Sequence, residues 1–372
     1  MTKSKKILFI VPHRVGRSPG QRFRFEQYFD KLEAAGYEIT VSNLLSENDD
    51  VTFYSRSRYF QKGIIVLKSI WKRYADLLRA GNFDIIFVYR EAIMLGSVWF
   101  EENLAKSGAR LIMDFDDAIW LKDVSEGNKN IAFLKKPEKT FRIVELADLV
   151  IVGNKFIADR CSMYNNNIKC IPTTIDTDYH RPYHDGRADQ AKICIGWTGT
   201  ETTLKHFETA LPSLERIYEK YSDKIHFKLI CDKAIEYPSI GLRSERWNKE
   251  TEIQDLNEMD IGLMPLPDDE WSRAKCGFKA LQYLSLEIPA IVSPVGVNTK
   301  IIDDGINGFF AKTSQEWFEK LELLILSHEL RVRMGKAGRE KVKVEFSKNR
   351  WFKRYIELFD SCISTPESCL VG

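Results

Sequence analysis

The sequence contains no apolar run of the roughly 18–20 residues that a membrane-spanning helix needs. A signal peptide is not indicated either. The apolar stretch after the first lysines, from Ile7 to Pro12, is too short for its hydrophobic core and precedes no small-residue cleavage site. We expect this stretch to form a buried first strand. These two absences predict a soluble protein of the cytoplasm.

Paired cysteines and a strong excess of charge are also missing. The seven cysteines are odd in number and contain no CxxC pair, which argues against a disulfide framework or a structural zinc site and indicates a reducing compartment. The 55 basic and 53 acidic residues give a net charge of +2. Nothing in this balance indicates nucleic acid as a partner.

What the chain does contain is typical of a globular protein. It is 44% hydrophobic and 29% charged. Its 372 residues exceed the roughly 250–300 at which a single hydrophobic core stops growing, which favours two domains.

Short apolar runs alternate with amphipathic helical stretches along the first half. The runs are KKILFIVP, YEITVSNLL, DIIFVYR, ARLIMDFDD and ADLVIVGN. The stretch RFRFEQYFDKLEAAG reads as one helix between the first two runs. Strands that are apolar throughout and alternate with helices predict a parallel sheet covered on both faces.

The stretch 178–192 has almost no aliphatic residues and contains Pro and Gly, which indicates a linker. Beyond it the alternation restarts with KICIGWTG, KIHFKLICD, MDIGLMPL and PAIVSP. We therefore expect two doubly wound α/β domains, at 1–178 and 192–345, and a C-terminal helix in 346–372 that could pack back on the first domain. Ligands of such sheets bind beyond the carboxyl ends of the strands, so we expect a ligand cleft between the domains.

The segment from Asp260 to Gly308 has the strongest signs of chemistry. A helix is expected to begin near Gly277, and the N–H groups at its start would be free donors for an anion at a positive helix end. These donors belong to Lys275, Cys276, Gly277 and Phe278. Lys275 and Lys279 are four residues apart and can reach the same charge. An ordinary amphipathic helix with two solvated lysines is the alternative.

The string KALQYLSLEIPAIVSPVGVNTKIIDDGINGF resembles the donor-binding segment of the family-4 retaining glycosyltransferases, which have the GT-B fold. Typical members have two glutamates eight positions apart, where this chain has Ala274 and Gln282. It resembles a variant branch in which a lysine, here Lys279, meets the donor diphosphate. A lysine neutralises phosphate, and the Gln282 amide could bond sugar hydroxyls. The resemblance also implies that Leu281 lies with the donor.

The resemblance extends over most of the chain. ADLVIVGNKFIAD and KCIPTTIDTDYHRP are similar to the end of the family's first domain, and GWTGTETTLKHF takes the place of the first loop in its second domain. Typical members have an Arg and a Lys on the pyrophosphate in that loop. Here Lys205 matches the Lys and the Arg position is not basic. Gly199 and Thr200 could supply donors, or form only a tight turn. Trp247 could pack on the nucleobase or support a strand.

The loop SPGQRFRFEQY replaces the glycine-rich loop that most members have after their first strand. Gly20 would allow a ligand to approach the backbone closely. Arg22 and Arg24 are two residues apart, so their side chains diverge. We expect Arg22 to face the donor and Arg24 to lie on the surface.

The motif DFDDAIW, at 114–120, could in principle bind Mg²⁺ through three carboxylates. The resemblance disfavours that reading, because the GT-B fold neutralises its diphosphate with cations and helix ends, and it implies no metal or other cofactor. Asp116 stands near the place where many members have a histidine beside the reacting sugar. We therefore expect Asp116 to be catalytic and Asp117 and Arg90 to contact the acceptor, a structural Arg–Asp pair being the alternative.

Residues 51–79 are basic and rich in aromatic side chains. Such a stretch could lie on an anionic membrane surface. The alternative is an ordinary amphipathic helix whose apolar residues pack on the sheet. These residues are Ile64, Leu67, Trp71 and Leu78.

The resemblance implies a retaining hexosyl- or deoxyhexosyltransferase that uses a nucleotide diphosphate sugar and the hydroxyl of a glycan or lipid-linked acceptor. Surface polysaccharide or glycolipid assembly, at the inner face of the membrane, is the expected setting. Lys279, Lys205 and Asp116 would be the catalytic residues. A nucleotide-sugar epimerase or a phosphorylase of the same shape is one alternative. A catalytically silent nucleotide-binding scaffold is another, because the glutamate pair is missing.

Overall fold

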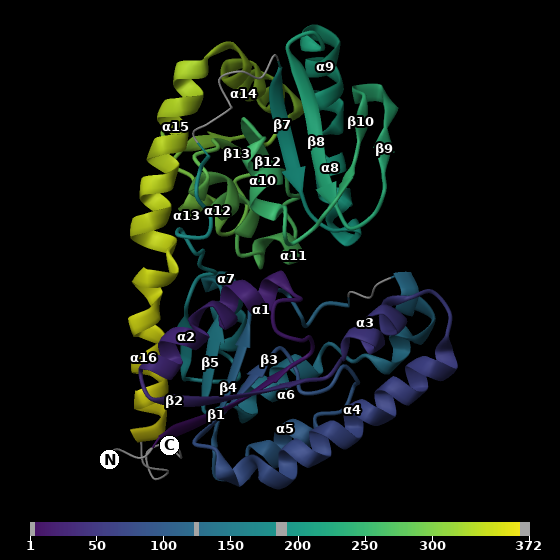
Figure 1. Cartoon of the computed structure of the whole chain (residues 1–372), viewed down its shortest axis with the longest axis vertical. Helices are drawn as coiled ribbons and strands as arrows, with labels where there is room; N and C mark the ends of the chain where they lie inside the picture. Colours follow the sequence, from purple (N-terminus) through teal and green to yellow (C-terminus); the bar gives the residue numbers. More distant parts are fainter. Residues whose placement is uncertain (1–3, 123–125, 184–191, 365–372) are drawn as a thin grey trace. The chain divides into compact units, whose positions relative to one another are not determined.

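The computed structural model describes residues 4–122, 126–183 and 192–364, and its chain divides into two compact units. The first unit comprises residues 1–173 and 351–372, and the second comprises residues 174–350 (Figure 1). Of the predicted linker at 178–192, residues 184–191 lie outside the described part of the chain.

The first unit is built on a six-stranded sheet in which every neighbouring pair is parallel. In spatial order its strands are β2 (Tyr37–Asn43), β1 (Lys5–Val11), β3 (Ile85–Tyr89), β4 (Arg110–Phe115), β5 (Leu149–Val152) and β6 (Ile168–Cys170). The buried first strand expected at Ile7 to Pro12 is β1.

Helices cover both faces of this sheet. They are α1 (Pro19–Arg24), α2 (Phe29–Ala34), α3 (Glu47–Tyr54), α4 (Tyr59–Arg79), α5 (Trp99–Leu104), α6 (Lys139–Leu146), α7 (Lys155–Cys161) and α16 (Lys348–Ser364), with 3-10 turns at Glu26–Tyr28, Ala80–Asn82 and Glu126–Leu134. Alternate residues of β1 belong to different cores. Phe9 packs with Tyr355 and Phe359 of α16, whereas Leu8 and Ile10 share a core with α5.

The stretch predicted as one helix from Arg22 onward is interrupted at Phe25, whose φ of −139° is not helical. Phe25 packs on Phe9, Phe87 and Tyr89, with ring centroids 5.2–5.4 Å apart. The tertiary packing of this aromatic side chain therefore overrides the local helical preference and separates α1 from α2.

The second unit contains another six-stranded parallel sheet. In spatial order its strands are β11 (Glu245–Arg246), β8 (Ile225–Cys231), β7 (Ile193–Thr198), β12 (Ile261–Met264), β13 (Ala290–Val292) and β14 (Gly308–Phe310). A small antiparallel pair is formed by β9 (Glu236–Tyr237) and β10 (Leu242–Arg243). The predicted α/β class with two doubly wound parallel sheets is thus confirmed.

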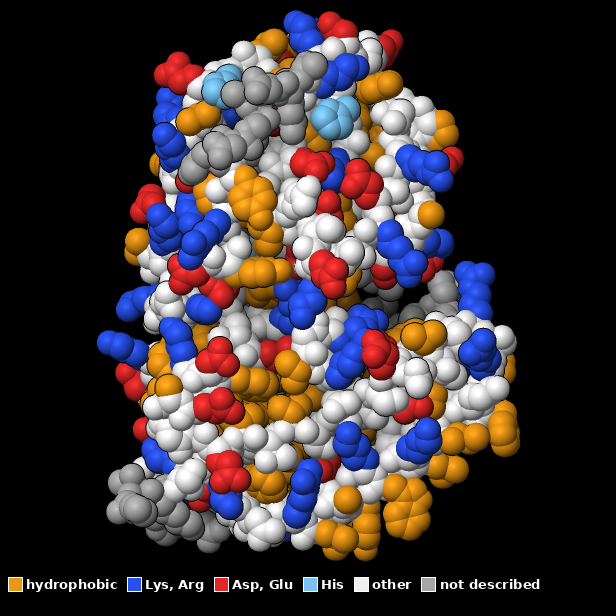
Figure 2. Space-filling view, viewed as in Figure 1, with side chains coloured by type: hydrophobic (Ala, Val, Ile, Leu, Met, Phe, Trp, Pro, Cys, Tyr) orange, Lys and Arg blue, Asp and Glu red, His pale blue; other side chains and the backbone are white. Residues whose placement is uncertain are grey.

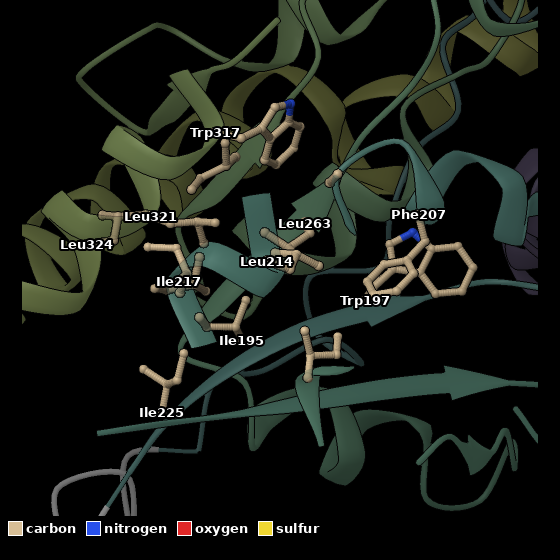
Figure 3. Packing of buried hydrophobic residues seen from close by; sticks show 14 of the residues in the cluster. Ile195, Trp197, Phe207, Leu214, Ile217, Ile225, Leu263, Trp317, Leu321 and Leu324 are labelled. Atoms are coloured by element: carbon tan, nitrogen blue, oxygen red, sulfur yellow. The ribbon is translucent and has the colours of Figure 1, made fainter. Parts of the chain in front are cut away.

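The helices of the second unit are α8 (Leu204–Glu208), α9 (Leu211–Tyr221), α10 (Glu252–Asn257), α11 (Glu270–Arg273), α12 (Phe278–Ser285), α13 (Asn298–Ile301), α14 (Ser314–Leu326) and α15 (His328–Lys341), with a π turn at Val342–Phe346 and 3-10 turns at Glu201–Thr203 and Pro238–Ile240. Their core joins β7 to α9 and α14. In Figure 3, Ile195 of β7 lies among Leu214, Ile217 and Leu321.

The apolar residues of α4 that sequence analysis placed against the sheet face outward instead. Ile64, Leu67, Trp71 and Leu78 are exposed, by 40% to 74%. The buried side of α4 carries Lys62, Ile65, Ser69, Arg73 and Asp76 instead. No helix in the described part of the chain is long and apolar enough to cross a membrane.

Candidate functional site

The loops after β7 and before α12 form the first candidate site, in the second unit. Trp197, near the end of β7, is buried and packs on Phe207 of α8 with ring centroids 5.6 Å apart, as Figure 3 shows. The Nζ atom of Lys279, in the first turn of α12, lies 5.4 Å from the centre of the Trp197 ring. The tilted aromatic pair thus supports an ammonium group beside the strand end.

The positive charges of three lysines act on His206 of α8. Its side chain is only 3% exposed, and its Nε2 atom has no hydrogen-bond partner in the structure. Burial, together with the positive charges of Lys275, Lys279 and Lys205, lowers the pKa of His206 to about 4. Sequence analysis singled out these lysines but missed the histidine between them.

The start of α12 differs in one respect from the expected row of free donors. Lys275 N–H donates to the carbonyl of Ser272 at 3.1 Å, so it is already used. Gly277 precedes the helix with φ of 70°, a left-handed conformation that favours glycine. A Cβ atom at this position would lie 2.2 Å from Cδ1 of Ile301. The helix therefore begins where predicted, and the site has fewer backbone donors than expected.

Two donor-side residues of α12 are placed differently from the prediction. Gln282 is buried, and its Nε2 donates to Oε1 of Glu252 on α10 at 3.3 Å. Leu281 is fully buried. The amide of Gln282 is thus engaged within the fold, because this face of α12 packs inward.

Hydrogen bonds to β8 and within the loop hold the segment that follows β7. Gly199 N–H donates to the carbonyl of Ile230 at 3.0 Å, so the expected backbone donor is used within the fold. The Thr200 hydroxyl is exposed and lies 3.0 Å from Oγ1 of Thr202. Trp247, directly after β11, is half-buried, and its backbone N–H donates to the carbonyl of Cys231. Its role against a nucleobase stays a prediction.

A second cluster lies at the carboxyl ends of β3 and β4 in the first unit. Arg90 follows β3 with φ of 66°, and its Nη2 donates to Asp116 at 3.1 Å and to Asp117 at 2.8 Å. The Tyr89 hydroxyl donates to Oδ1 of Asp116 at 2.9 Å. Burial raises the pKa of Tyr89 well above its ordinary value, which keeps this donor protonated. The Arg–Asp pair that sequence analysis left open is therefore present.

Gly20 of α1 packs directly on this second cluster. A Cβ atom there would lie 2.2 Å from the Tyr89 hydroxyl oxygen and 3.6 Å from Oδ2 of Asp116. The close approach that Gly20 allows is thus to Tyr89. The guanidinium of Arg22, in the same helix, lies 4.9 Å from the ring centre of Phe23.

The expectation that Arg24 lies on the surface is wrong. It is buried, and it donates to both carboxylate oxygens of Asp114, at 3.0 and 2.7 Å, and to the Ile171 carbonyl at 2.5 Å. A buried carboxylate needs a charged partner, which explains the placement. Asp114 therefore pairs with Arg24 inside the fold, whereas Asp116 accepts from Tyr89 and Arg90. Across residues 4–122, 126–183 and 192–364, no group of three or more His, Cys, Asp or Glu could hold a metal ion.

Sequence analysis also missed a cluster in which Asp50 of α3 meets the loop after β1. Oδ2 of this buried carboxylate accepts from Arg17 at 2.5 Å and from Arg14 at 3.2 Å, and its Oδ1 lies 3.9 Å from Nδ1 of His13. Burial lowers the pKa of His13 to about 4. The position of His13, two residues after a central strand, was the available signal.

The two clusters suit different chemistry. In the second unit, three lysines around a neutral imidazole can neutralise and hydrogen-bond a phosphate group. In the first unit, carboxylates held by Arg90 and Tyr89 can accept hydrogen bonds from hydroxyl groups or take up a proton.

Comparison with known proteins adds a family for part of the chain. Residues 269–341 match the family described as "Glycosyl transferases group 1". This segment contains Lys275 and Lys279. No curated protein matches the sequence.

Solved structures resemble the whole chain at low sequence identity. A glycosyltransferase from Rickettsia africae is 13% identical with a TM-score of 0.66, covering 98% of this chain and 100% of its own. The sucrose-phosphate synthase of Thermosynechococcus elongatus is 13% identical with a TM-score of 0.67, covering 96% and 98%. Anabaena HepE, solved in complex with UDP-glucose, is 12% identical with a TM-score of 0.66, covering 96% and 99%. The chain therefore has the GT-B fold, and its residues 269–341 match the glycosyl transferases group 1 family.

Proposed function

We propose that the protein is a glycosyltransferase that moves a sugar, with retention of anomeric configuration, from a nucleotide diphosphate sugar to an acceptor hydroxyl. The observation that carries this proposal is the Lys279 ammonium 5.4 Å from the Trp197 ring, next to the buried His206 on which the charges of Lys205, Lys275 and Lys279 act. Two of these lysines belong to the segment that matches the glycosyl transferases group 1 family.

In this proposal the second unit binds the donor. The bond between the anomeric carbon and the diphosphate oxygen breaks, and its electron pair stays on the diphosphate. The three lysines stabilise the growing negative charge, and His206 donates a hydrogen bond from Nε2 in the tautomer that carries a proton there. Charges fixed in advance around a leaving group are usually the largest contribution to catalysis.

The first unit supplies the acceptor side. The acceptor hydroxyl forms the new bond to the anomeric carbon on the face that the diphosphate leaves, and its proton passes to the departing diphosphate oxygen. Asp116, oriented by Tyr89 and Arg90, would stabilise positive charge on the sugar during transfer. Asp117 and Arg90 would bind acceptor hydroxyls.

We further propose that the acceptor is a glycan or a lipid-linked sugar of surface polysaccharide or glycolipid assembly, reached at an anionic membrane surface that residues 51–79 contact. The donor sugar would be a hexose or deoxyhexose. Thermal unfolding with UDP-, GDP- and dTDP-sugars identifies the donor, because a bound ligand raises the apparent stability.

The direct test is the variant Lys279→Ala with the donor that this screen identifies. We expect turnover to fall by at least about a hundredfold, since a fixed charge on the leaving group is lost. Lys300→Ala, which removes an exposed lysine of α13, is the matched control and should retain turnover.

Near-normal turnover of Lys279→Ala would remove this residue from the mechanism. Donor binding by the wild-type protein without transfer to any acceptor or donor hydrolysis would favour a silent scaffold instead. Conversion of the donor sugar in the absence of an acceptor would favour an epimerase.

A further inference from the structure

The outer face of α4 is a continuous apolar stripe that no described part of the chain covers. Its members recur at spacings of four and three residues, which places them along one side of the helix. They are Phe60, Ile64, Leu67, Trp71, Tyr74 and Leu78, each exposed by at least 40%. In Figure 2, hydrophobic side chains gather at the lower right, over the position of α4 in Figure 1. We call these six residues the α4 stripe.

A polar network on the opposite side of α4 attaches the helix to the sheet. Arg73 is buried and donates to the carbonyls of Val11, Ser42 and Ala92, at 2.6–3.1 Å, and to Asp76 at 2.8 Å. Asp76 also accepts from the Ser42 hydroxyl at 2.6 Å. The inner face thus meets its hydrogen-bonding needs without the α4 stripe, which is left for another contact.

The exposed charges that α4 itself contributes beside the α4 stripe are all positive, with Lys68 lying 3.4 Å from Asp49 of α3 and Arg79 donating to the buried Asp76 at 2.7 Å. In α4, all of whose residues the structure describes, the exposed charged residues are Lys68, Lys72 and Arg79, and the single acid, Asp76, is buried. By helical spacing these three cations lie along one flank of the stripe. Arg56 and Arg58 are exposed immediately before the helix. Large apolar side chains bordered by cations are typical of a helix that lies in the plane of an anionic membrane surface.

We propose that the α4 stripe inserts into the headgroup region of an anionic lipid bilayer, with the helix parallel to the membrane plane. At 1.5 Å per residue the 21 residues of α4 would give a contact about 30 Å long. Lys72 extends its ammonium group to lipid phosphates while its methylene stem lies along the stripe. Lys68, whose ammonium lies 3.4 Å from Oδ1 of Asp49, would exchange this exposed contact for a lipid phosphate. A second copy of the chain fits less well, because it would bring two basic flanks together.

This inference rests on the proposed function only in the choice of a lipid surface as the place of the acceptor. Its test therefore uses no donor or acceptor. Co-sedimentation is measured with phosphatidylcholine vesicles, with and without phosphatidylglycerol, at low and high salt. We expect the wild-type protein to bind only the vesicles that contain phosphatidylglycerol, and less at high salt.

The decisive variant is Leu67→Glu/Trp71→Glu. It should lower the vesicle partition coefficient at least about tenfold, because two large apolar side chains become charged in the contact. The matched control, Leu323→Glu/Leu326→Glu, makes the same change at two exposed leucines of α14 and should bind within about twofold of wild type. Lys68→Glu/Lys72→Glu, with the stripe intact, should also lose binding, and it provides a second variant if the first does not fold.

Binding of Leu67→Glu/Trp71→Glu equal to that of wild type would overturn the proposal, as would absence of wild-type binding at low salt. A dimer seen in lipid-free sedimentation that this variant abolishes would assign the stripe to a second copy instead. Vesicle binding by a protein that binds no nucleotide sugar would contradict the proposed function while leaving the membrane contact supported.

Discussion

At the scale of single residues, the pKa of His206 can report on the proposed donor site. Burial depresses this pKa most, and the three lysines that depress it as well are those proposed to hold the diphosphate. A bound diphosphate would offset their charge, and the pKa of His206 would then rise from about 4 toward the ordinary value of about 6.5.

We predict that UDP raises the pKa of His206 in an NMR titration of the histidine Cε1 resonances. His206→Gln assigns the signal. The exposed His226, near the start of β8 and so at the opposite end of the strand from the candidate site, serves as the control that should not respond. A His206 titration that stays unchanged under saturating UDP would place the phosphates elsewhere.

At the scale of elements, buried ion pairs link helices to the sheet of the first unit. Arg24 of α1 is bonded to Asp114 of β4, and the Tyr355 hydroxyl of α16 donates to the Arg24 carbonyl at 2.9 Å. Three elements distant in sequence thus meet at one polar contact, from which water is excluded.

We expect Arg24→Ala to lower the free energy of unfolding by about 3–5 kcal/mol, because it leaves the Asp114 carboxylate buried without its partner. Urea unfolding followed by near-UV circular dichroism measures the change. Arg22→Ala, at the half-buried neighbouring arginine, should cost less than about 1 kcal/mol. Equal losses for the two variants would show that burial of the ion pair is not the cause.

Which face of a helix packs inward could not always be predicted from the sequence. The spacing of Leu67 and Trp71 gives one apolar face of α4, but the face that packs inward is the one that carries Arg73, whose guanidinium finds carbonyl partners there. Ile70 and Leu77 on that side pack against the core. Periodicity cannot reveal such carbonyl partners, which are distant in sequence. Three-residue strands such as β6 and β14 are too short to give a pattern of their own. Long apolar strands such as β1 and β3 were predictable because burial on both faces leaves them apolar throughout.

The candidate site was predictable in part for the same reason. Lys275 and Lys279 were found through helical spacing and family resemblance, which are local in sequence. His206 was missed, and the burial of Gln282 against Glu252 of α10 was not foreseen, because the surroundings of both side chains come from other elements. Arg24 was misjudged because its partner, Asp114, is ninety residues away.

At the scale of the whole molecule, both units contain a histidine with a pKa of about 4, the half-buried His13 in the first and the buried His206 in the second. The unfolded chain takes up protons at these residues below about pH 6.5, whereas the folded chain does not until about pH 4. The stability contribution is therefore present above about pH 6.5 and is lost as the pH falls toward 4.

We predict that each histidine lowers the stability of its unit by about 1 kcal/mol between pH 7.5 and 5.5. Thermal unfolding across this range measures the loss. The double variant His13→Gln/His206→Gln should show a flatter pH dependence than wild type. A pH dependence identical to that of wild type would mean that these imidazoles take up protons equally well in the folded chain.

The glycine at position 199 limits how this enzyme candidate can be re-engineered. A methyl group added there would lie 2.1 Å from the Trp197 ring, and the Lys279 ammonium rests near the same ring. Any library that diversifies the loop after β7 to change sugar preference would therefore also disturb the proposed contact of Lys279 with phosphate, unless residue 199 is kept constant. Variation at the exposed Thr200 and Thr202 avoids that conflict.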